Sequence, residues 1–107
     1  MFVRVAGVED VRAGRGVRVY ARGIAIGLYR VGERYYAMED DCPHAGFPLS
    51  EGELSGTVIT CAAHGFDYDV TSGFKPGYED GFPIPCFPVR VEDAGIFVDV
   101  VLPDDDD

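Results

Sequence analysis

Two short stretches, CPHAG at residues 42–46 and CAAHGFD at residues 61–67, contain both histidines and two of the three cysteines of the chain. The first stretch has the spacing Cys-x-His and the second the spacing Cys-x-x-His. Thiolates favour soft or borderline metals, and imidazole suits iron and zinc. The four side chains are therefore predicted to converge on one metal centre. The predicted ligands are Cys42, His44, Cys61 and His64.

The spacing alone leaves the kind of centre open. Two cysteines and two histidines also form tetrahedral zinc sites, in which the metal stabilises a small binding module. Two buried core cysteines with two unrelated surface histidines would need no metal at all. Two matched pairs in one short chain seldom coincide by chance, so the pattern favours a metal over that last interpretation.

Outside these stretches, β-branched and aromatic residues alternate with Gly, Pro and Asp, which is typical of short antiparallel strands. No window of about eleven residues keeps a helical period, and Val8–Arg12 is expected to form one helical turn at most. The sequence predicts a single all-β domain, a sandwich or small barrel, over residues 1–107. The predicted strands are Phe2–Val5, Gly16–Tyr20, Ile24–Arg30, Tyr35–Glu39, Val58–Thr60, Phe66–Val70, Phe87–Glu92 and Ile96–Val101.

Length and charge limit the functions that this chain can have. With 107 residues it has the size of one domain, and its formal net charge is −10. Nucleic acid is excluded as a general partner, because phosphate binding needs a basic surface. The acidity suits a basic protein partner, or it only confers solubility.

No apolar run approaches the ~20 residues of a membrane span. The start does not resemble a signal peptide and the cysteine count is odd, so a soluble cytoplasmic protein is expected.

The two stretches resemble the two-loop signature of Rieske proteins. Three later segments are similar to that family as well: Thr71-Ser72-Gly73 to its turn, Gly81–Pro85 to its proline loop, and Phe87–Glu92 to its closing strand. The resemblance implies a Rieske-type fold of antiparallel sheets, with a cluster-binding subdomain at about residues 41–86 made of two ligand loops and a proline loop. It also implies one [2Fe–2S] cluster per chain. One iron would be held by Cys42 and Cys61, and the other by His44 and His64.

Further residues receive roles from the same resemblance. Gly46 and Gly65 are expected to let the backbone approach the cluster, so that N–H groups point at its sulfurs, although both can also be plain turn glycines. Pro83 belongs to the loop expected to cover the cluster. The Tyr68 hydroxyl is expected either to donate to a cysteine sulfur or only to pack in the core. Cys86 matches no ligand position, and we interpret it as an ordinary thiol.

Two departures from the high-potential Rieske proteins predict a comparatively low reduction potential. The extra cysteine pair of those proteins is absent, and Phe66 occupies the position of a serine that donates to a bridging sulfide. Rieske centres in general span about −150 to +300 mV, against about −400 mV for all-cysteine plant-type clusters. With those donors missing, this chain is expected in the lower part of the Rieske range.

The resemblance predicts a ferredoxin that carries single electrons and is not itself a catalyst. Its expected partners are a flavin-dependent NAD(P)H reductase, which supplies the electron, and a terminal oxygenase, which accepts it. The small subunit of an assimilatory nitrite reductase is an alternative with a similar signature. Docking is expected through acidic residues near the histidine end of the cluster, and not through the Asp104–Asp107 tail. The candidates are Asp40, Asp41, Glu51 and Asp67.

Overall fold

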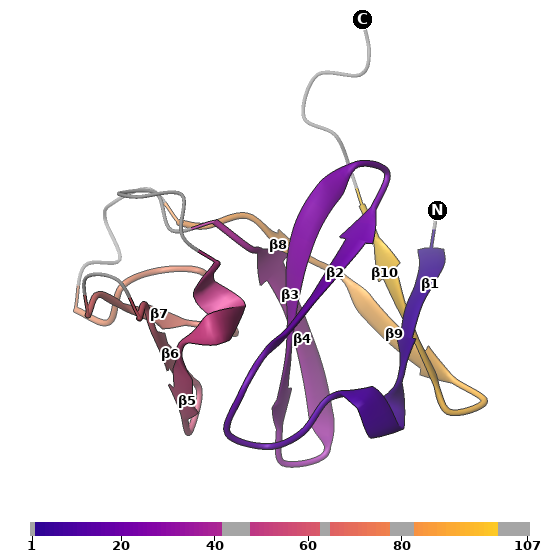
Figure 1. Cartoon of the computed structure of the whole chain (residues 1–107), viewed down its shortest axis with the longest axis horizontal. Coiled ribbons are helices and arrows are strands. Elements are labelled where there is room, and N and C mark those ends of the chain that lie inside the picture. Colours follow the sequence, from indigo (N-terminus) through magenta and orange to yellow (C-terminus); the bar gives the residue numbers. More distant parts are fainter. Residues whose placement is uncertain (1, 42–47, 63–64, 78–82, 101–107) are drawn as a thin grey trace, which may run out of the picture.

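The computed structural model describes residues 2–41, 48–62, 65–77 and 83–100, and these confirm the all-β prediction (Figure 1). Their helical elements are two short 3₁₀ turns, η1 (Val8–Asp10) and η2 (Leu49–Glu51). In these residues no helix is long and apolar enough to cross a membrane. The strands are β1 (Phe2–Gly7), β2 (Val17–Ala21), β3 (Ile24–Val31), β4 (Arg34–Glu39), β5 (Glu53–Ser55), β6 (Val58–Thr60), β7 (Asp67–Asp69), β8 (Cys86–Phe87), β9 (Val89–Glu92) and β10 (Gly95–Asp99).

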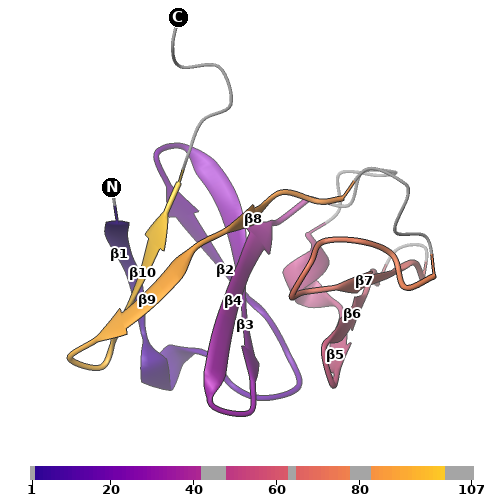
Figure 2. The same ribbon diagram turned by 180° about the vertical axis from the view of Figure 1, so that it is seen from behind.

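The strands form three antiparallel sheets, with the orders β1-β10-β9, β2-β3-β4-β8 and β5-β6-β7. The β2-β3-β4-β8 sheet lies between the other two, as the views from both sides show (Figures 1 and 2). We refer to the first two sheets as the base. The remaining part, residues 41–85 with the β5-β6-β7 sheet, is the small-sheet region.

The middle sheet is shared by two hydrophobic cores. Successive strand residues point to opposite faces, so a strand buried on both faces reads as a continuous apolar run. In β3, Ile26 and Leu28 are fully buried in the base core, whereas Tyr29 is fully buried in the core beneath the small sheet. In β4, Ala37 and Met38 alternate in the same way. The small-sheet region is therefore packed directly on the base.

Tight turns join most of the strands that are neighbours in both sequence and sheet. Asp93 and Ala94 both have positive φ, 51° and 63°, and form a two-residue hairpin between β9 and β10. Arg22, at φ 53°, and the following glycine do the same between β2 and β3. These turns match the right-handed twist of the flanking strands, which is why they fix the strand register locally.

One predicted strand is wrong. The sequence predicted a single strand over Phe87–Glu92, but the chain divides there into β8, which pairs with β4, and β9, which pairs with β10. Pro88 lies between the two strands. It interrupts the strand because proline has no backbone N–H to donate to a sheet ladder. Its carbonyl accepts the Asp99 N–H at 3.1 Å. The same segment thus belongs to two sheets. Strand β5 and the turn η2 were also missed.

Candidate metal centre

The predicted ligands lie in the small-sheet region, and Cys61 is the one that the structure describes. Cys42, His44, His64 and Gly46 lie outside the described residues. For this reason the described residues contain no group of three or more His, Cys, Asp or Glu that could hold a metal ion. The site is therefore built from Cys61 and from the segments that begin and end each loop.

Cys61 follows β6 directly and begins a short loop that is closed by its own backbone. The Cys61 N–H donates to the Phe66 carbonyl at 2.7 Å, and the Gly65 N–H donates to the Cys61 carbonyl at 2.8 Å. Gly65 has φ 74°, and a Cβ there would have open space around it, so the backbone conformation is what favours glycine. The Cys61 residue is 1% exposed and belongs to the core beneath the small sheet.

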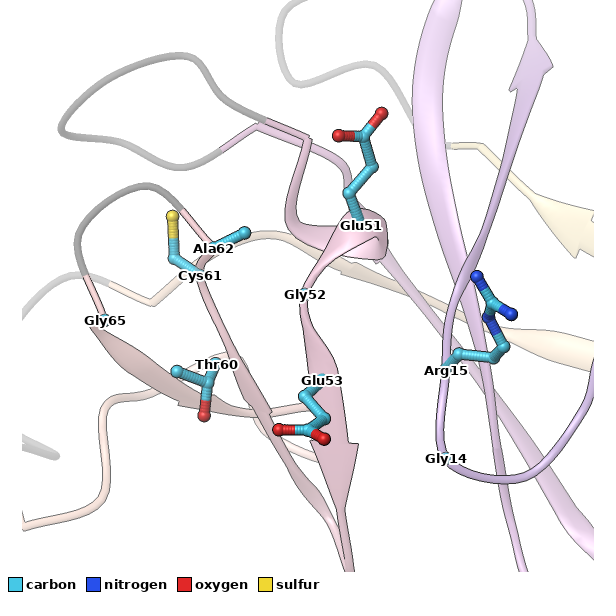
Figure 3. Close-up of a pocket in the computed structure, with 9 residues that line it drawn as sticks. All are labelled: Gly14, Arg15, Glu51, Gly52, Glu53, Thr60, Cys61, Ala62 and Gly65. Carbon is cyan, nitrogen blue, oxygen red and sulfur yellow. The ribbon is translucent and has the colours of Figure 1, made fainter.

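The described end of the first loop lies beside the start of the second. Turn η2 ends the first loop, and a Cβ on Gly52, the next residue, would overlap the Thr60 carbonyl, which immediately precedes Cys61. Only glycine permits this approach. A cleft of about 690 Å³ opens beside Cys61 between the small sheet and the Gly14–Arg15 turn of the base (Figure 3). Its charged lining residues are Glu51, Glu53 and Arg15, so negative groups outnumber positive ones by one.

The segment that follows β7 is fastened to the described end of the predicted proline loop. The Gly73 N–H donates to the Asp69 carbonyl at 2.7 Å, and the Ile84 N–H donates to the Gly73 carbonyl at 2.8 Å. A Cβ on Gly73 would overlap the Ile84 carbonyl, and its φ is 84°. Asp69 also accepts hydrogen bonds from the Thr71 N–H and hydroxyl at 2.9 and 2.6 Å. Ile84 is buried, while Pro83 is exposed.

Two aromatic residues flank the Cys61 loop. Tyr68 lies on β7 opposite Ile59, is 2% exposed and has a buried hydroxyl. Phe66 is half-buried, and the Lys75 ammonium lies 4.4 Å from the centre of its ring. Such a cation–π contact contributes about 0.5–1 kcal/mol at an exposed site. Lys75 is also the only lysine of the chain, and it lies beside the second ligand loop.

A buried carboxylate marks the start of the first loop. Asp40 has no exposed surface, so the expectation that it docks a partner is wrong. Its Oδ1 accepts the Ser50 N–H at 2.7 Å, and its Oδ2 accepts the Ser50 hydroxyl at 2.6 Å. Arg18 Nε lies 3.7 Å from Oδ2. Burial raises the pKa of Asp40, whereas the Ser50 hydrogen bonds and Arg18 oppose the rise. No sequence signal separated this aspartate from Asp41, which is exposed.

The third cysteine lies in the base. Cys86 is on β8, paired with Met38 of β4, and its thiol lies 3.6 Å from the Ile84 carbonyl. Partial burial of this thiol, with a smaller contribution from the Asp69 carboxylate, raises the pKa of Cys86. A raised thiol pKa opposes formation of the thiolate that binds metals.

The described residues fit an iron–sulfur group. Cluster ligation uses the thiolate, and a thiolate buried among apolar side chains is costly unless a metal or another partner compensates its charge. Cys61 is buried in such surroundings, in a loop whose backbone bonds close on themselves. A thiolate from this loop, together with the donors predicted in the adjacent loop, would supply the donor chemistry that a mixed Cys/His cluster requires.

Comparison with known proteins identifies the class. The family model of the Rieske [2Fe–2S] domain matches residues 1–88. The ferredoxin CarAc of Metapseudomonas resinovorans is 35% identical over 99 residues, which cover 92% of each chain. The ferredoxin component of a p-cumate 2,3-dioxygenase system from Pseudomonas putida is 34% identical over 100 residues, 92% of this chain and 85% of the relative.

Solved structures agree with this result. The ferredoxin in a complex with the reduced oxygenase of carbazole 1,9a-dioxygenase superposes with a TM-score of 0.80 at 35% identity, covering 91% of this chain and all of that one. The small subunit of a nitrite reductase has the same TM-score, 0.80, at 17% identity, and covers 94% of this chain and 99% of its own length. At that identity the likeness shows the fold alone.

This chain belongs to the Rieske [2Fe–2S] domain family. Within that family it is a ferredoxin, which holds one [2Fe–2S] cluster and carries electrons without catalysing a reaction itself. Family membership decides against the zinc-stabilised module that the ligand spacing left open.

Proposed function

We propose that this ferredoxin transfers one electron at a time from a flavin-dependent NAD(P)H reductase to a terminal oxygenase in the cytoplasm. In the proposed site, Cys42 and Cys61 hold one iron of the cluster, and His44 and His64 hold the other. The bound cluster supplies one-electron redox chemistry. Residues 41–86 serve as its binding subdomain within a single domain of residues 1–107.

The observation that carries the proposal is the Cys61 loop. Its buried cysteine, its closed backbone and its contact with the end of the first loop support the proposed role of Cys61 as a thiolate ligand. Each residue has a separate task in this arrangement. Cys61 supplies a thiolate, Gly65 allows the turn, and Tyr68 packs behind the loop with its hydroxyl buried. Cys61 is 1% exposed, so little water reaches it.

The oxygenase is proposed as the acceptor because two relatives at 34–35% identity are ferredoxins named with dioxygenases, one of them in complex with its oxygenase. The donor is proposed by the same analogy. Neutral histidines in place of two thiolates make the oxidised centre less negative, which eases reduction by a flavin.

The test is reconstitution with purified partners. The protein should contain about two irons and two acid-labile sulfides per chain. After reduction, its EPR spectrum should have the low average g value of mixed His/Cys ligation. It should then support product formation by an oxygenase of this class when NAD(P)H and a flavin reductase are supplied. Nitrite reduction without oxygenase turnover would contradict the proposal and favour the nitrite reductase alternative.

A further inference from the structure

We propose that Asp40 and Ser50 are positioning residues that hold the first ligand loop closed at its base. This inference rests on the proposed assignment of Cys42 and His44 as ligands. Both predicted ligands lie in the sequence between the two residues, which are ten positions apart. Neither Asp40 nor Ser50 would itself touch the cluster. They would act through the loop that they join.

The contact between the two residues is short, double and buried. One carboxylate oxygen accepts the Ser50 N–H at 2.7 Å and the other accepts the Ser50 hydroxyl at 2.6 Å. Asp40 is 0% exposed and Ser50 is 6% exposed. Because these hydrogen bonds use both oxygens of the carboxylate, they fix the relative orientation of the two residues as well as the distance between them. Joining the ends of a loop also removes conformational freedom from the residues between them.

The base holds this pair in place from one side. The Asp40 N–H continues the sheet by donating to the Ala25 carbonyl at 2.9 Å, and Arg18 on β2 faces the carboxylate at 3.7 Å. On the next residue, Asp41 Oδ1 lies 3.9 Å from Arg18 Nη2. The start of the loop is thus fixed to two strands of the middle sheet.

Two glycines in the base provide the space for the pair. A Cβ on Gly27 of β3 would lie 3.2 Å from Asp40 Oδ1 and 2.6 Å from the Tyr29 hydroxyl. A Cβ on Gly16 would lie 2.9 Å from the Ser50 Cα. Side chains at either position would displace the pair or the tyrosine behind it. The base therefore leaves room on the face that carries the loop.

The end of the loop also continues into the second ligand loop. After Ser50, turn η2 closes with the Gly52 N–H donating to the Leu49 carbonyl at 2.9 Å. Gly52 then packs on the Thr60 carbonyl, one residue before Cys61. A displacement of Ser50 would therefore reach both predicted ligand loops. For this reason the pair is expected to affect ligand geometry and not only global stability.

The experiment measures the release of iron to a chelator and the EPR spectrum of the reduced holoprotein. Ser50→Ala removes one of the two hydrogen bonds and should release iron about tenfold faster, the effect expected of one buried hydrogen bond to a carboxylate. Asp40→Ala removes both and should release iron about a hundredfold faster. Asp40→Asn keeps an acceptor oxygen for the Ser50 N–H, so it should lie closer to the wild type than Asp40→Ala. The EPR lines of all three variants should shift or broaden.

Two controls separate positioning from stability. Ser55→Ala removes an exposed hydroxyl from β5 and should change neither measurement. Ile96→Val truncates the base core, so it should lower the melting temperature while leaving the EPR spectrum and the iron release below the transition unchanged.

The inference is overturned if Ser50→Ala and Asp40→Ala release iron within twofold of the wild-type rate with an unchanged spectrum. It is equally overturned if Ile96→Val, at a comparably lowered melting temperature, releases iron as fast as these two variants. If Asp40→Ala fails to fold, Ser50→Ala and Asp40→Asn decide the question alone. A wild-type protein without iron and sulfide would instead refute the proposed function, so the two failures are distinguishable.

Discussion

The base and the small-sheet region differ most in their charge. Residues 1–40 and 86–100 contain eight acidic residues and eight arginines, whereas residues 41–85 contain seven acidic residues and Lys75 alone. The remaining four acidic residues close the chain at Asp104–Asp107. Leaving the tail aside, the negative charge of the protein therefore belongs to the region that carries the predicted ligands. A partner with a basic face would be oriented towards this region before contact.

The two regions also differ in how they are held together. The base has strands of up to eight residues, joined by tight hairpins. Each strand of the small sheet has three residues. Such a sheet is too small to be stable alone, so it depends on the core that it shares with Tyr29 and Met38 of the base. The base is thus held by its own core, and we expect the small-sheet region to gain further stability from the bound cluster.

The cysteines provide the largest expected contrast between the two regions. Cys61→Ser should abolish the cluster, because it removes a predicted ligand, whereas Cys86→Ser in β8 should leave iron and sulfide unchanged. Iron and sulfide analysis of the purified variants measures both. Loss of the cluster from Cys86→Ser would show that the ligand assignment is wrong.

Truncation of the two cores tests whether the small-sheet region alone depends on the cluster. Ile59→Ala and Ile96→Ala each remove a fully buried side chain, and each should cost about 2–5 kcal/mol of stability. Ile59 lies two residues before Cys61, so its variant should also lose iron faster below the thermal transition. Ile96→Ala should melt at a lower temperature with its visible spectrum unchanged. Equal iron loss from both variants would contradict the comparison.

Neutralising charges tests whether docking uses the small-sheet region. Removing the carboxylates of Glu51 and Glu53, with Glu51→Gln and Glu53→Gln together, should slow electron transfer with the partner by about two- to fivefold at low salt. It should also flatten the dependence of that rate on ionic strength. Stopped-flow kinetics measures both quantities. Glu33→Gln, on an exposed turn of the base, and deletion of Asp104–Asp107 should leave the salt dependence nearly unchanged.

Tyr29, a residue of the base that packs in the core beneath the small sheet, should make the stability of the protein depend on alkaline pH. Its buried hydroxyl has no hydrogen-bond partner among the described residues, and burial, with a smaller contribution from Asp40, raises the pKa of Tyr29. Since the folded state holds this proton more tightly, stability is retained below the unfolded pKa of about 10. Above it, the free energy of unfolding should fall by up to about 1.4 kcal/mol per pH unit. Tyr29→Phe should remove that share of the alkaline decrease, which urea unfolding at several pH values would measure.

The smallest expected effect concerns Tyr68. If its buried hydroxyl donates to a cysteine sulfur, it stabilises the more negative reduced cluster, and Tyr68→Phe should lower the potential by several tens of mV, roughly 1 kcal/mol. Tyr36→Phe, on a half-buried tyrosine of β4, serves as the control and should leave the potential unchanged. Protein-film voltammetry measures both variants. An unchanged potential in Tyr68→Phe would mean that this side chain only packs in the core.

The sequence by itself determined the local features of this protein. The β-branched runs predicted most of the strands, and the residues that separate the predicted strands include the tight turns at Arg22-Gly23 and Asp93-Ala94. The ligand motif indicated the family because the residues that carry the donor atoms, and the spacing between them, are read directly from the sequence. The assignment of Cys42, His44, Cys61 and His64 as ligands stays a prediction, and the first, second and last of these residues lie outside the described part of the structure.

Only the tertiary structure decided how these local features combine. Pro88 divides a predicted strand between two sheets, which depends on which neighbours are available to β8 and β9. Asp40 is buried and joined to Ser50 although its neighbour Asp41 is exposed. Burial is a property of the assembled sheets and not of residue type, so adjacent aspartates with the same chemistry can have opposite environments. The tertiary structure also decided that two cores share one sheet. The alternation of side chains along a strand shows that the strand has two faces, but it does not show what covers each face.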